Sequence, residues 1–365
     1  MNRRKGSILS LAAAALAGLA LTASRPAAAD GYTVTDLGAL IGMPYTSIWQ
    51  QTINNGGVIA GYANSSADDI ANSTFFGDSA FLWKNGTITP LPGLPGAIDT
   101  VPFSLNNNGT VVGRSTPDGQ RSHAVLWDHG VIRALGELPG DNKSASLQIN
   151  DRGQAVGYSR QPVADGNHLR AVVWYKGKIS RLSSLPGGDG WEEALGINKE
   201  GQIVGFAGPA PGLEHIALWD KDGVHDLGTL GGEWGEAIAN NNKGQVVGLS
   251  ANASGNISPF LWENGVLTDL GTLAGDVGAA AVDINNQGQI VGTSGIELVN
   301  GNFADIYTSH AVLWENGVMT DLQTKIPAGS GWTITSANGI NDRGQIVAQG
   351  VYNGNLRAVL LTPVH

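Results

Sequence analysis

The chain contains no cysteine, and this absence excludes several kinds of site and anchor at once. Disulfides, thiolate metal ligands, cysteine nucleophiles and a lipoprotein anchor all require this residue. A fold without disulfides must be stabilised by burial of apolar side chains, and 365 residues are enough to bury a sizeable core. The sequence also contains no G-x-S-x-G, H-E-x-x-H or phosphate-loop motif, so it indicates no familiar class of catalytic site.

Long apolar runs are also missing, and the short run near the N-terminus is typical of a signal peptide. Basic residues 3–5 precede an apolar stretch from Ile8 to Ala23, and the alanines at 27–29 supply an A-x-A cleavage site. The stretch is rich in alanine and shorter than the roughly 20 residues that span a membrane. We predict a signal peptide over 1–29, one mature domain over 30–365, and a bacterial protein that is secreted or periplasmic.

Basic side chains are scarce. Residues 1–29 contain four of the 21 basic residues and none of the 31 acidic ones, so the mature chain has 17 against 31 and a net charge of −14. A surface this acidic repels phosphate backbones and anionic lipids, so nucleic acid and membranes are not expected partners. The 53 glycines indicate many turns in a chain that still has enough apolar residues for a core.

The pattern I-N-x-x-G-Q-V/I-V-x-G recurs seven times. Asparagine caps a turn with its side chain and glycine takes the left-handed position, so N-x-x-G predicts a short hairpin between two strands, A and B. The turn glycines are 43 to 56 residues apart, a spacing typical of propeller blades. In the fifth copy Asn240 replaces the isoleucine or leucine that precedes the motif asparagine. The turn glycines are Gly57, Gly109, Gly153, Gly201, Gly244, Gly288 and Gly344.

A second hairpin, with strands C and D, follows each of the first six copies. Strand C is apolar at successive positions and ends in tryptophan, so we expect it to be buried on both faces, whereas the polar strand D lies outside. The C strands are Ala80–Trp83, Ala124–Trp127, Ala171–Trp174, Ile216–Trp219, Pro259–Trp262 and Ala311–Trp314. Their predicted two-residue turns, typical of type I′, are Asn85-Gly86, His129-Gly130, Lys176-Gly177, Asp222-Gly223, Asn264-Gly265 and Asn316-Gly317.

These repeats predict an all-β fold, a seven-bladed β-propeller with four antiparallel strands in each blade. The seventh copy ends at His365 without a strand D. Tyr32–Gly38 has the pattern of a D strand but precedes the first A strand, so it lacks a partner of its own. We therefore expect this N-terminal strand to pair with Arg357–Leu361 and complete the last blade.

The repeats also resemble a named family. The tripeptides His310-Ala311-Val312 and His123-Ala124-Val125, together with L-W-x-N-G and I-N-x-x-G-Q-V-V-G, are similar to the HAF family of probable extracellular repeat proteins. The resemblance covers essentially all of 31–365. It implies secretion and repetition, and it brings no established activity and no catalytic residues.

Strand alternation places the A–B and C–D turns on one face and the B–C and D–A loops on the other. The second face has loops of very unequal length, and loops on a rigid scaffold often carry binding sites. Four tryptophans reach it and can either stack on sugar rings or fill gaps between blades. They are Trp49 in the first A strand and Trp191, Trp234 and Trp332 in D–A loops.

Acidic residues gather in the same loops. Asp189, Glu193 and Glu233 are the candidates for ligand binding, and paired carboxylates can also perform glycosidase-type acid–base chemistry. The alternative for such residues is a purely solvated role. Aspartates near 68, 69 and 78 suit Ca²⁺ but lack a D-x-D-x-D-G loop, so neither a metal ion nor a cofactor is expected. His123, His215 and His310 begin C strands, where they most simply tie a strand end.

Three functional hypotheses remain open. The first is a monomeric, non-catalytic protein that binds an extracellular ligand or surface, with a glycan favoured over a protein. The second is a secreted polysaccharide hydrolase or lyase with its site on the loop-rich face. The third is a purely structural repeat protein. Aspartate, glutamate and histidine side chains that converge in one deep central pocket would favour the enzyme, and a flat, aromatic-lined mouth would favour binding.

Overall fold

A computed structural model describes most of the chain after residue 30. The described residues are 31–39, 43, 45–64, 79–161, 168–188, 191–210, 212–299, 302–304 and 309–364. The predicted signal peptide, the aspartates at 68, 69 and 78, and Asp189 lie outside them. Within the described residues, no helix combines the length and the apolar character needed to cross a membrane.

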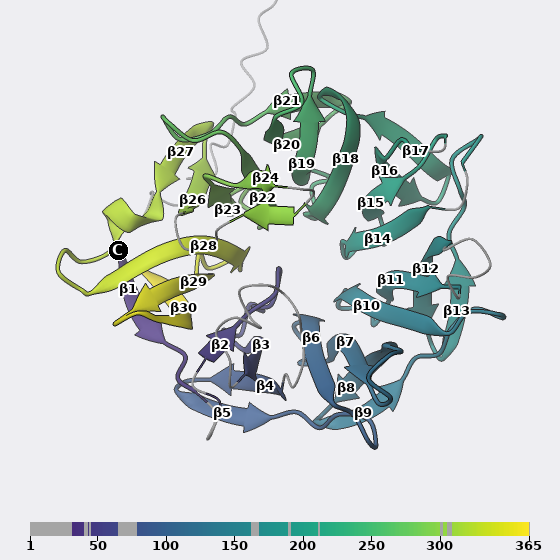
Figure 1. Ribbon diagram of the computed structural model, residues 1–365, viewed down its shortest axis with the longest axis horizontal. Coiled ribbons are helices and arrows are strands. Elements are labelled where there is room, and N and C mark those ends of the chain that lie inside the picture. The colour runs from purple at the N-terminus through teal and green to yellow at the C-terminus, as the bar shows by residue number, and fades with distance from the viewer. Residues whose placement is uncertain are drawn as a thin grey trace, which may run out of the picture.

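Seven four-stranded antiparallel sheets surround a central axis, so the chain is a seven-bladed β-propeller (Figure 1). Blade 1 contains β2 (Tyr45–Ser47), β3 (Ile59–Asn64), β4 (Ser79–Lys84) and β5 (Thr87–Pro90). Blade 2 contains β6 (Asp99–Leu105), β7 (Val111–Thr116), β8 (His123–Asp128) and β9 (Val131–Ala134). Blade 3 contains β10 (Lys143–Ile149), β11 (Ala155–Arg160), β12 (Leu169–Tyr175) and β13 (Lys178–Arg181).

The remaining blades repeat this order of strands A to D. Blade 4 contains β14 (Glu192–Ile197), β15 (Ile203–Ala207), β16 (His215–Asp220) and β17 (Gly223–Gly228). Blade 5 contains β18 (Gly231–Asn240), β19 (Val246–Asn252), β20 (Ile257–Glu263) and β21 (Val266–Asp269). Blade 6 contains β22 (Ala279–Ile284), β23 (Ile290–Ser294), β26 (His310–Glu315) and β27 (Val318–Asp321), with the hairpin β24 (Glu297–Val299) and β25 (Asn302–Ala304) in its B–C loop. Blade 7 contains β28 (Trp332–Ile340), β29 (Ile346–Tyr352), β30 (Asn355–Val364) and β1 (Gly31–Asp36), preceded by the 3₁₀ helix η2 (Leu322–Lys325).

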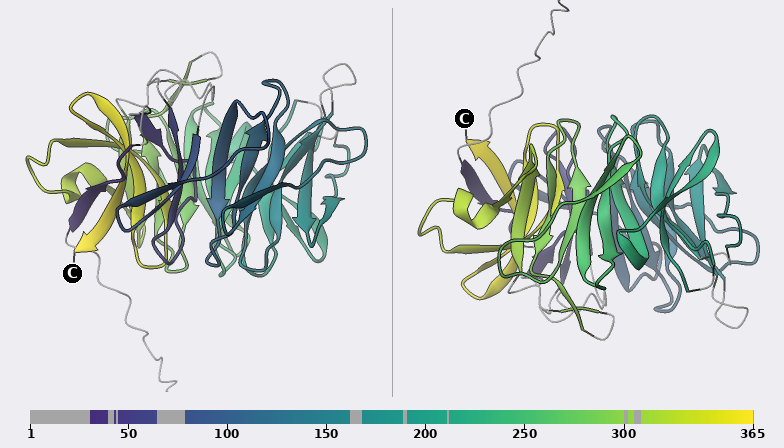
Figure 2. Two further views of the ribbon diagram at one scale, coloured as in Figure 1. Left: turned by 90° about the horizontal axis from the view of Figure 1, so that it is seen from below. Right: turned by 90° about the horizontal axis from the view of Figure 1, so that it is seen from above.

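The predicted ring closure is confirmed. Strand β1 pairs antiparallel with β30, so that Tyr32 faces Pro363 and Val34 faces Leu361 (Figure 1). The first and last segments of the described chain therefore lie in one blade. The two faces of the ring are seen from the side in Figure 2. We call the face formed by the A–B and C–D turns the turn face, and the face formed by the B–C and D–A loops the loop face.

The tight C–D turns follow the prediction with one exception. At Asn85 and Gly86 the φ angles are 49° and 83°, as a type I′ turn requires, and four other predicted pairs behave alike. In blade 4 the prediction is wrong by one residue, because Asp220 pairs with Gly223 and the turn residues are Lys221 and Asp222. The cause is local: Asp220 Oδ1 accepts the backbone N–H of Asp222 at 2.8 Å, which stabilises this different turn.

Strand C is buried on both faces, as predicted. In β8 all residues from Ala124 to Trp127 are buried, and Trp127 is only 1% exposed. Its Nε1 donates to the carbonyl oxygen of Pro92 in the preceding D–A loop at 2.8 Å, so the indole has a partner for its one polar atom. Among the six strand-C tryptophans, Trp262 is the exception because it is only half-buried, and Leu82, Val173 and Leu261 are also half-buried.

Apolar clusters fill each gap between neighbouring blades. The residue before the motif asparagine contributes to these clusters, as Ile149 and Ile197 do. In the gap between blades 4 and 5 that position is Asn240, which is 8% exposed. Its Nδ2 donates to the carbonyl oxygen of Gln202, but its buried Oδ1 has no partner. This gap therefore departs from the pattern of the others.

Candidate functional site

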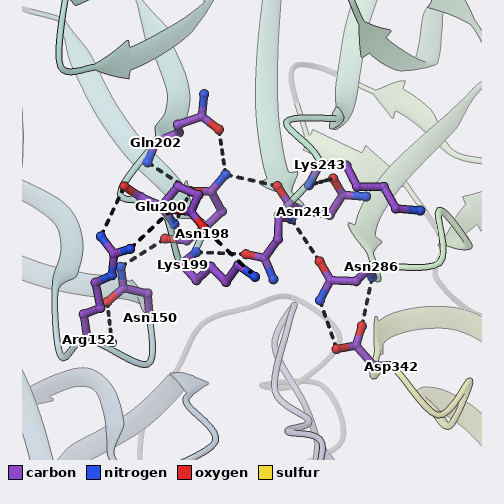
Figure 3. Close-up of polar contacts among 11 residues, drawn as sticks. Asn150, Arg152, Asn198, Lys199, Glu200, Gln202, Asn241, Lys243, Asn286 and Asp342 are labelled. Carbon is purple, nitrogen blue, oxygen red and sulfur yellow. Dashed lines mark hydrogen bonds and ion pairs between the residues drawn. The ribbon is translucent and has the colours of Figure 1, made fainter.

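Seven asparagines join neighbouring blades in a closed belt around the axis. The Oδ1 of each accepts backbone N–H groups of its own A–B turn, as Asn54 Oδ1 does from Gly56 and Val58. The Nδ2 donates to the carbonyl oxygen of the equivalent asparagine in the next blade at 3.0–3.1 Å. Figure 3 shows part of this series of hydrogen bonds. The first belt runs through Asn54, Asn106, Asn150, Asn198, Asn241, Asn285, Asn341 and back to Asn54.

The next residue of each turn forms a second belt with one gap. Here a backbone N–H donates to a side-chain oxygen of the next blade, for example from Asn286 to Asp342 Oδ1 at 2.9 Å (Figure 3). The same geometry links Asp342 back to Asn55 at 2.8 Å. Lys199 occupies this position in blade 4, and a lysine side chain has no acceptor, so the link from Asp151 is missing.

A cavity of about 390 Å³ lies on the axis within these belts. Its lining comes from the A–B turns of all seven blades, together with Gln51, Gln148 and Asp283. Burial raises the pKa of Asp283 to about 7. Two backbone N–H groups donate hydrogen bonds to its carboxylate and partly oppose this rise. The cavity opens on the turn face, which is not the face where the sequence predicts a site.

The loop face carries a different arrangement in blades 4 and 5. Trp191 and Glu193 in blade 4 repeat as Trp234 and Glu236 in blade 5, at the same distances before the belt asparagine. Side chains two residues apart on a strand point to the same side, so each tryptophan stands beside its glutamate. The positions equivalent to the two glutamates in the other blades hold Trp49, Val101, Ala145, Ala280 and Ser336.

Glu214, in the B–C loop of blade 4, couples the two copies of this Trp-x-Glu pattern. Its Oε1 accepts the indole N–H of Trp191 at 2.8 Å. Its carbonyl oxygen accepts the N–H of Gly235 at 2.8 Å, and its own N–H donates to the carbonyl oxygen of Glu233 at 3.2 Å. One residue therefore holds the blade 4 tryptophan by its side chain and the start of β18 by its backbone.

The carboxyl groups of this site are close enough to oppose each other's ionisation. Burial, with smaller contributions from the charges of Glu236 and Glu214, raises the pKa of Glu193 to about 8. Burial and the charge of Glu214 raise the pKa of Glu236 to about 7. Both side chains are half-buried, so they lie among protein groups and still contact solvent. Near neutral pH both carboxyl groups therefore hold protons part of the time.

Blade 3 reaches the same site through β11. Arg160 lies close enough to oppose the rise in the pKa of Glu193. Burial raises the pKa of the Tyr158 phenol, and the nearby charge of Glu193 raises it further. The two tryptophans are also partly packing residues: both are half-buried, and Trp234 contacts the apolar cluster that contains Ile238. The site thus combines aromatic surface, carboxyl groups, a phenol and one guanidinium group.

The structure brings together three of the predicted site residues, Trp191, Trp234 and Glu193. Trp49 instead packs edge-on against Phe103, with ring centroids 5.2 Å apart. Trp332 lies in blade 7 and stacks on Tyr352 at 4.9 Å. Glu233 is exposed and contributes its backbone carbonyl to Glu214, and Asp189 lies outside the described residues.

Sequence reasoning missed Glu214 and did not include Glu236 among the ligand-binding candidates. Alignment of the repeats was the available signal for Glu236, because it places Glu236 at the position of Glu193. Glu214 had no such signal, since its role depends on a loop that reaches the next blade.

The interpretation of the strand-C histidines as ties is confirmed. His123 Nδ1 lies 2.8 Å from Glu137 Oε1, and His215 Nδ1 lies 2.9 Å from Asp226 Oδ2. His310 Nδ1 lies 3.2 Å from Asp276 Oδ2, which also accepts a hydrogen bond from Ser294 Oγ. Among the described residues, no group of three or more histidine, aspartate or glutamate side chains is arranged to hold a metal ion.

Comparison with known proteins supports the fold alone. No family model matches the chain, and no curated protein matches it. The propeller domain of the trilobed protease from Pyrococcus furiosus is similar, with a TM-score of 0.54, 11% identity, and coverage of 87% of this chain and 95% of that one. Oligogalacturonate lyase from Vibrio parahaemolyticus has a TM-score of 0.51 and 9% identity, covering 90% and 93%.

TolB from Acinetobacter baumannii is also similar, with a TM-score of 0.44 and 11% identity. The match covers 88% of this chain but only 65% of TolB, so the chain corresponds to about two thirds of that protein's length.

Proposed function

We propose that this chain is a secreted, non-catalytic repeat protein that binds an extracellular glycan on the loop face between blades 4 and 5. The observation that carries the proposal is the paired Trp-x-Glu pattern coupled by Glu214. Sugars present apolar C–H faces that stack on indole rings and hydroxyl groups that hydrogen-bond to carboxyl groups. Trp191 and Trp234 supply the first kind of contact, and Glu193 and Glu236 supply the second.

The raised pKa values of Glu193 and Glu236 suit this role. A carboxyl group that exchanges its proton near neutral pH can accept a hydrogen bond from one hydroxyl and donate to another. Secretion rests on the predicted signal peptide and on the resemblance to the HAF family. Both are consistent with a ligand outside the cell.

A glycan array with the mature chain, beside a Trp191→Ala, Trp234→Ala double variant, tests the proposal. We expect the double variant to lose binding while its melting temperature changes little. Val131→Ala, far from the site on an exposed strand, is the control that should bind normally. Intact binding with a large loss of stability would make the two tryptophans packing residues and reject the proposed site.

A second candidate is a hydrolase or lyase that acts on polysaccharides at the same residues. A general acid must be protonated at the working pH, and a carboxyl group with a pKa of about 8 meets this condition at Glu193. Turnover assays on the polysaccharides that bind in the array separate the two functions. Product formation that Glu193→Gln abolishes without loss of binding would favour the enzyme.

A further inference from the structure

The axial cavity on the turn face is separate from the loop-face site, and its inner end is crossed by Gln51. Gln51 is buried, and its Nε2 donates to the carbonyl oxygen of Ile238 in blade 5 at 2.8 Å. Its Oε1 accepts from Gln148 Nε2 of blade 3, and its backbone N–H donates to the carbonyl oxygen of Asn338 in blade 7 at 2.8 Å. A residue of blade 1 thus contacts three blades around the axis, and in Figure 1 the purple chain near β2 reaches towards the centre.

The backbone of Gln51 has a φ of 57°, in the left-handed region. The other described non-glycine residues with positive φ each occupy the first position of a two-residue hairpin turn: Asn85, His129, Lys176, Asn264, Asn316 and Asn353. Gln51 lies instead in a turn at residues 50–51 that does not join two paired strands, and its hydrogen bonds to Ile238 and Asn338 fix that turn against other blades. Strained backbone of this kind is concentrated at ligand clamps and other functional positions.

The belts satisfy most of the polar groups of the cavity wall with their own hydrogen bonds. The Oδ1 atoms of the belt asparagines accept backbone N–H groups, and five first-belt asparagines also donate to a glutamine four residues later. Within the described residues, the Nδ2 of Asn242 has no hydrogen-bond partner, and Lys199 adds an exposed ammonium group. Asp283 lines the cavity and retains a free lone pair on each carboxylate oxygen, because each accepts one N–H.

Both kinds of charge surround the cavity. Asp151, Asp283 and Asp342 line it and oppose an anion. Lys199 also lines the cavity. Three further basic residues lie in the A–B turns around it, and their positive charges disfavour a bound cation: Arg152, Lys243 and Arg343. A hydroxyl group can both donate and accept a hydrogen bond. A ligand rich in hydroxyl groups can therefore bond to the donors and the acceptors of this wall while carrying no net charge.

We propose that the turn-face cavity binds a small, uncharged, hydroxyl-rich molecule, a monosaccharide or polyol, with Gln51 as its inner wall. The size of the cavity falls at the lower end of the range for small-molecule sites. This inference is independent of the loop-face site, because it uses neither tryptophan nor glutamate from that face.

Amide NMR titration of the mature chain with glucose and with myo-inositol tests the proposal. The N–H groups of Ile197 and Ile340 are the reporters, since they donate to Gln148 and Asp283 in the cavity. We expect both to shift saturably. Asn242→Ala should weaken binding by about tenfold, as the loss of one well-placed hydrogen bond does. Gln51→Gly keeps the positive φ and removes the side chain, and it should abolish the shifts.

The Trp191→Ala, Trp234→Ala double variant is the matched control and should bind as the unmodified chain does. Glucuronate and glucosamine, titrated in parallel, should bind at least tenfold more weakly than the uncharged probes. The proposal is overturned if neither uncharged probe produces saturable shifts, if a charged probe binds more tightly, or if the double variant abolishes binding. Shifts that survive Gln51→Gly and Asn242→Ala together would also overturn it.

Discussion

The Nδ2 of Asn341 donates a 3.0 Å hydrogen bond to the carbonyl oxygen of Asn54, which is 287 residues away in the chain. This bond closes the first asparagine belt between blade 7 and blade 1. The outer edge of blade 7 is closed separately by β1, which pairs with β30. The ring is therefore closed at its axis by side chains and at its rim by a strand.

Closure at the rim is expected to support the whole domain. Deletion of residues 30–38 removes β1 together with Tyr32 and Leu37, which are 4% and 2% exposed, and leaves the edge of β30 unpaired. We expect thermal unfolding to show a lower melting temperature for the entire transition. Thr33→Ala, at an exposed position of β1, is the control and should change it little. An unchanged melting curve for the deletion would show that the asparagine belt closes the ring by itself.

The strand-C tryptophans are expected to differ in their contribution according to burial. Trp219 is 3% exposed, so Trp219→Ala should reduce the free energy of unfolding by about 3–5 kcal/mol. Trp262 is half-buried at the equivalent position, so Trp262→Ala should have a smaller effect. Urea denaturation of both variants measures the difference. Equal losses, or a loss below about 1 kcal/mol at Trp219, would contradict burial of strand C on both faces.

Asn240 is expected to reduce the stability of the domain. Its buried Oδ1 lacks a hydrogen-bond partner. Its Nδ2 donates to the carbonyl oxygen of Gln202, which would keep a partner without it because that oxygen also accepts the N–H of Asn198. Asn240→Ile should therefore raise the free energy of unfolding by about 1–3 kcal/mol. The reverse change at the equivalent position, Ile197→Asn, should lower it. A loss of stability in Asn240→Ile would mean that the amide has a favourable role in the gap between blades 4 and 5.

Stability is expected to fall as pH rises from about 5 to 8. Glu193, Glu236 and Asp283 have pKa values raised above those of the unfolded chain, to about 8, 7 and 7. Between the unfolded and folded values the native state holds more protons, so each unit of pH increase disfavours it.

Melting temperatures measured across this range should decline, and Glu193→Gln combined with Asp283→Asn should flatten the decline. Glu200→Gln, on an exposed turn, is the control that should leave the slope unchanged. A melting temperature that rises with pH would show that these carboxyl groups are not protonated in the native state.

The repeats alone were sufficient to predict the architecture, because each blade is a local unit. Asn-x-x-Gly and Asn-Gly define hairpins through the backbone conformations that they permit, and the apolar run ending in tryptophan defines the buried strand. The orphan strand Tyr32–Gly38 could be paired with the last blade because one D strand was missing and one was left over. In blade 4 the predicted position of the C–D turn was wrong by one residue, because the Asp220 carboxylate accepts a backbone N–H and stabilises a different turn.

The sites depended on contacts between blades, which a repeat pattern does not describe. The motif asparagine was correctly predicted to cap its own turn, but its bond to the next blade exists only because the ring places consecutive turns side by side. Glu214 acts between blades 4 and 5, and Gln51 bonds across the axis to blade 5, at distances along the chain that no local pattern reports. The sequence by itself determined the blades and their order, and the curvature of the closed ring decided which polar side chains meet at the axis and at the loop face.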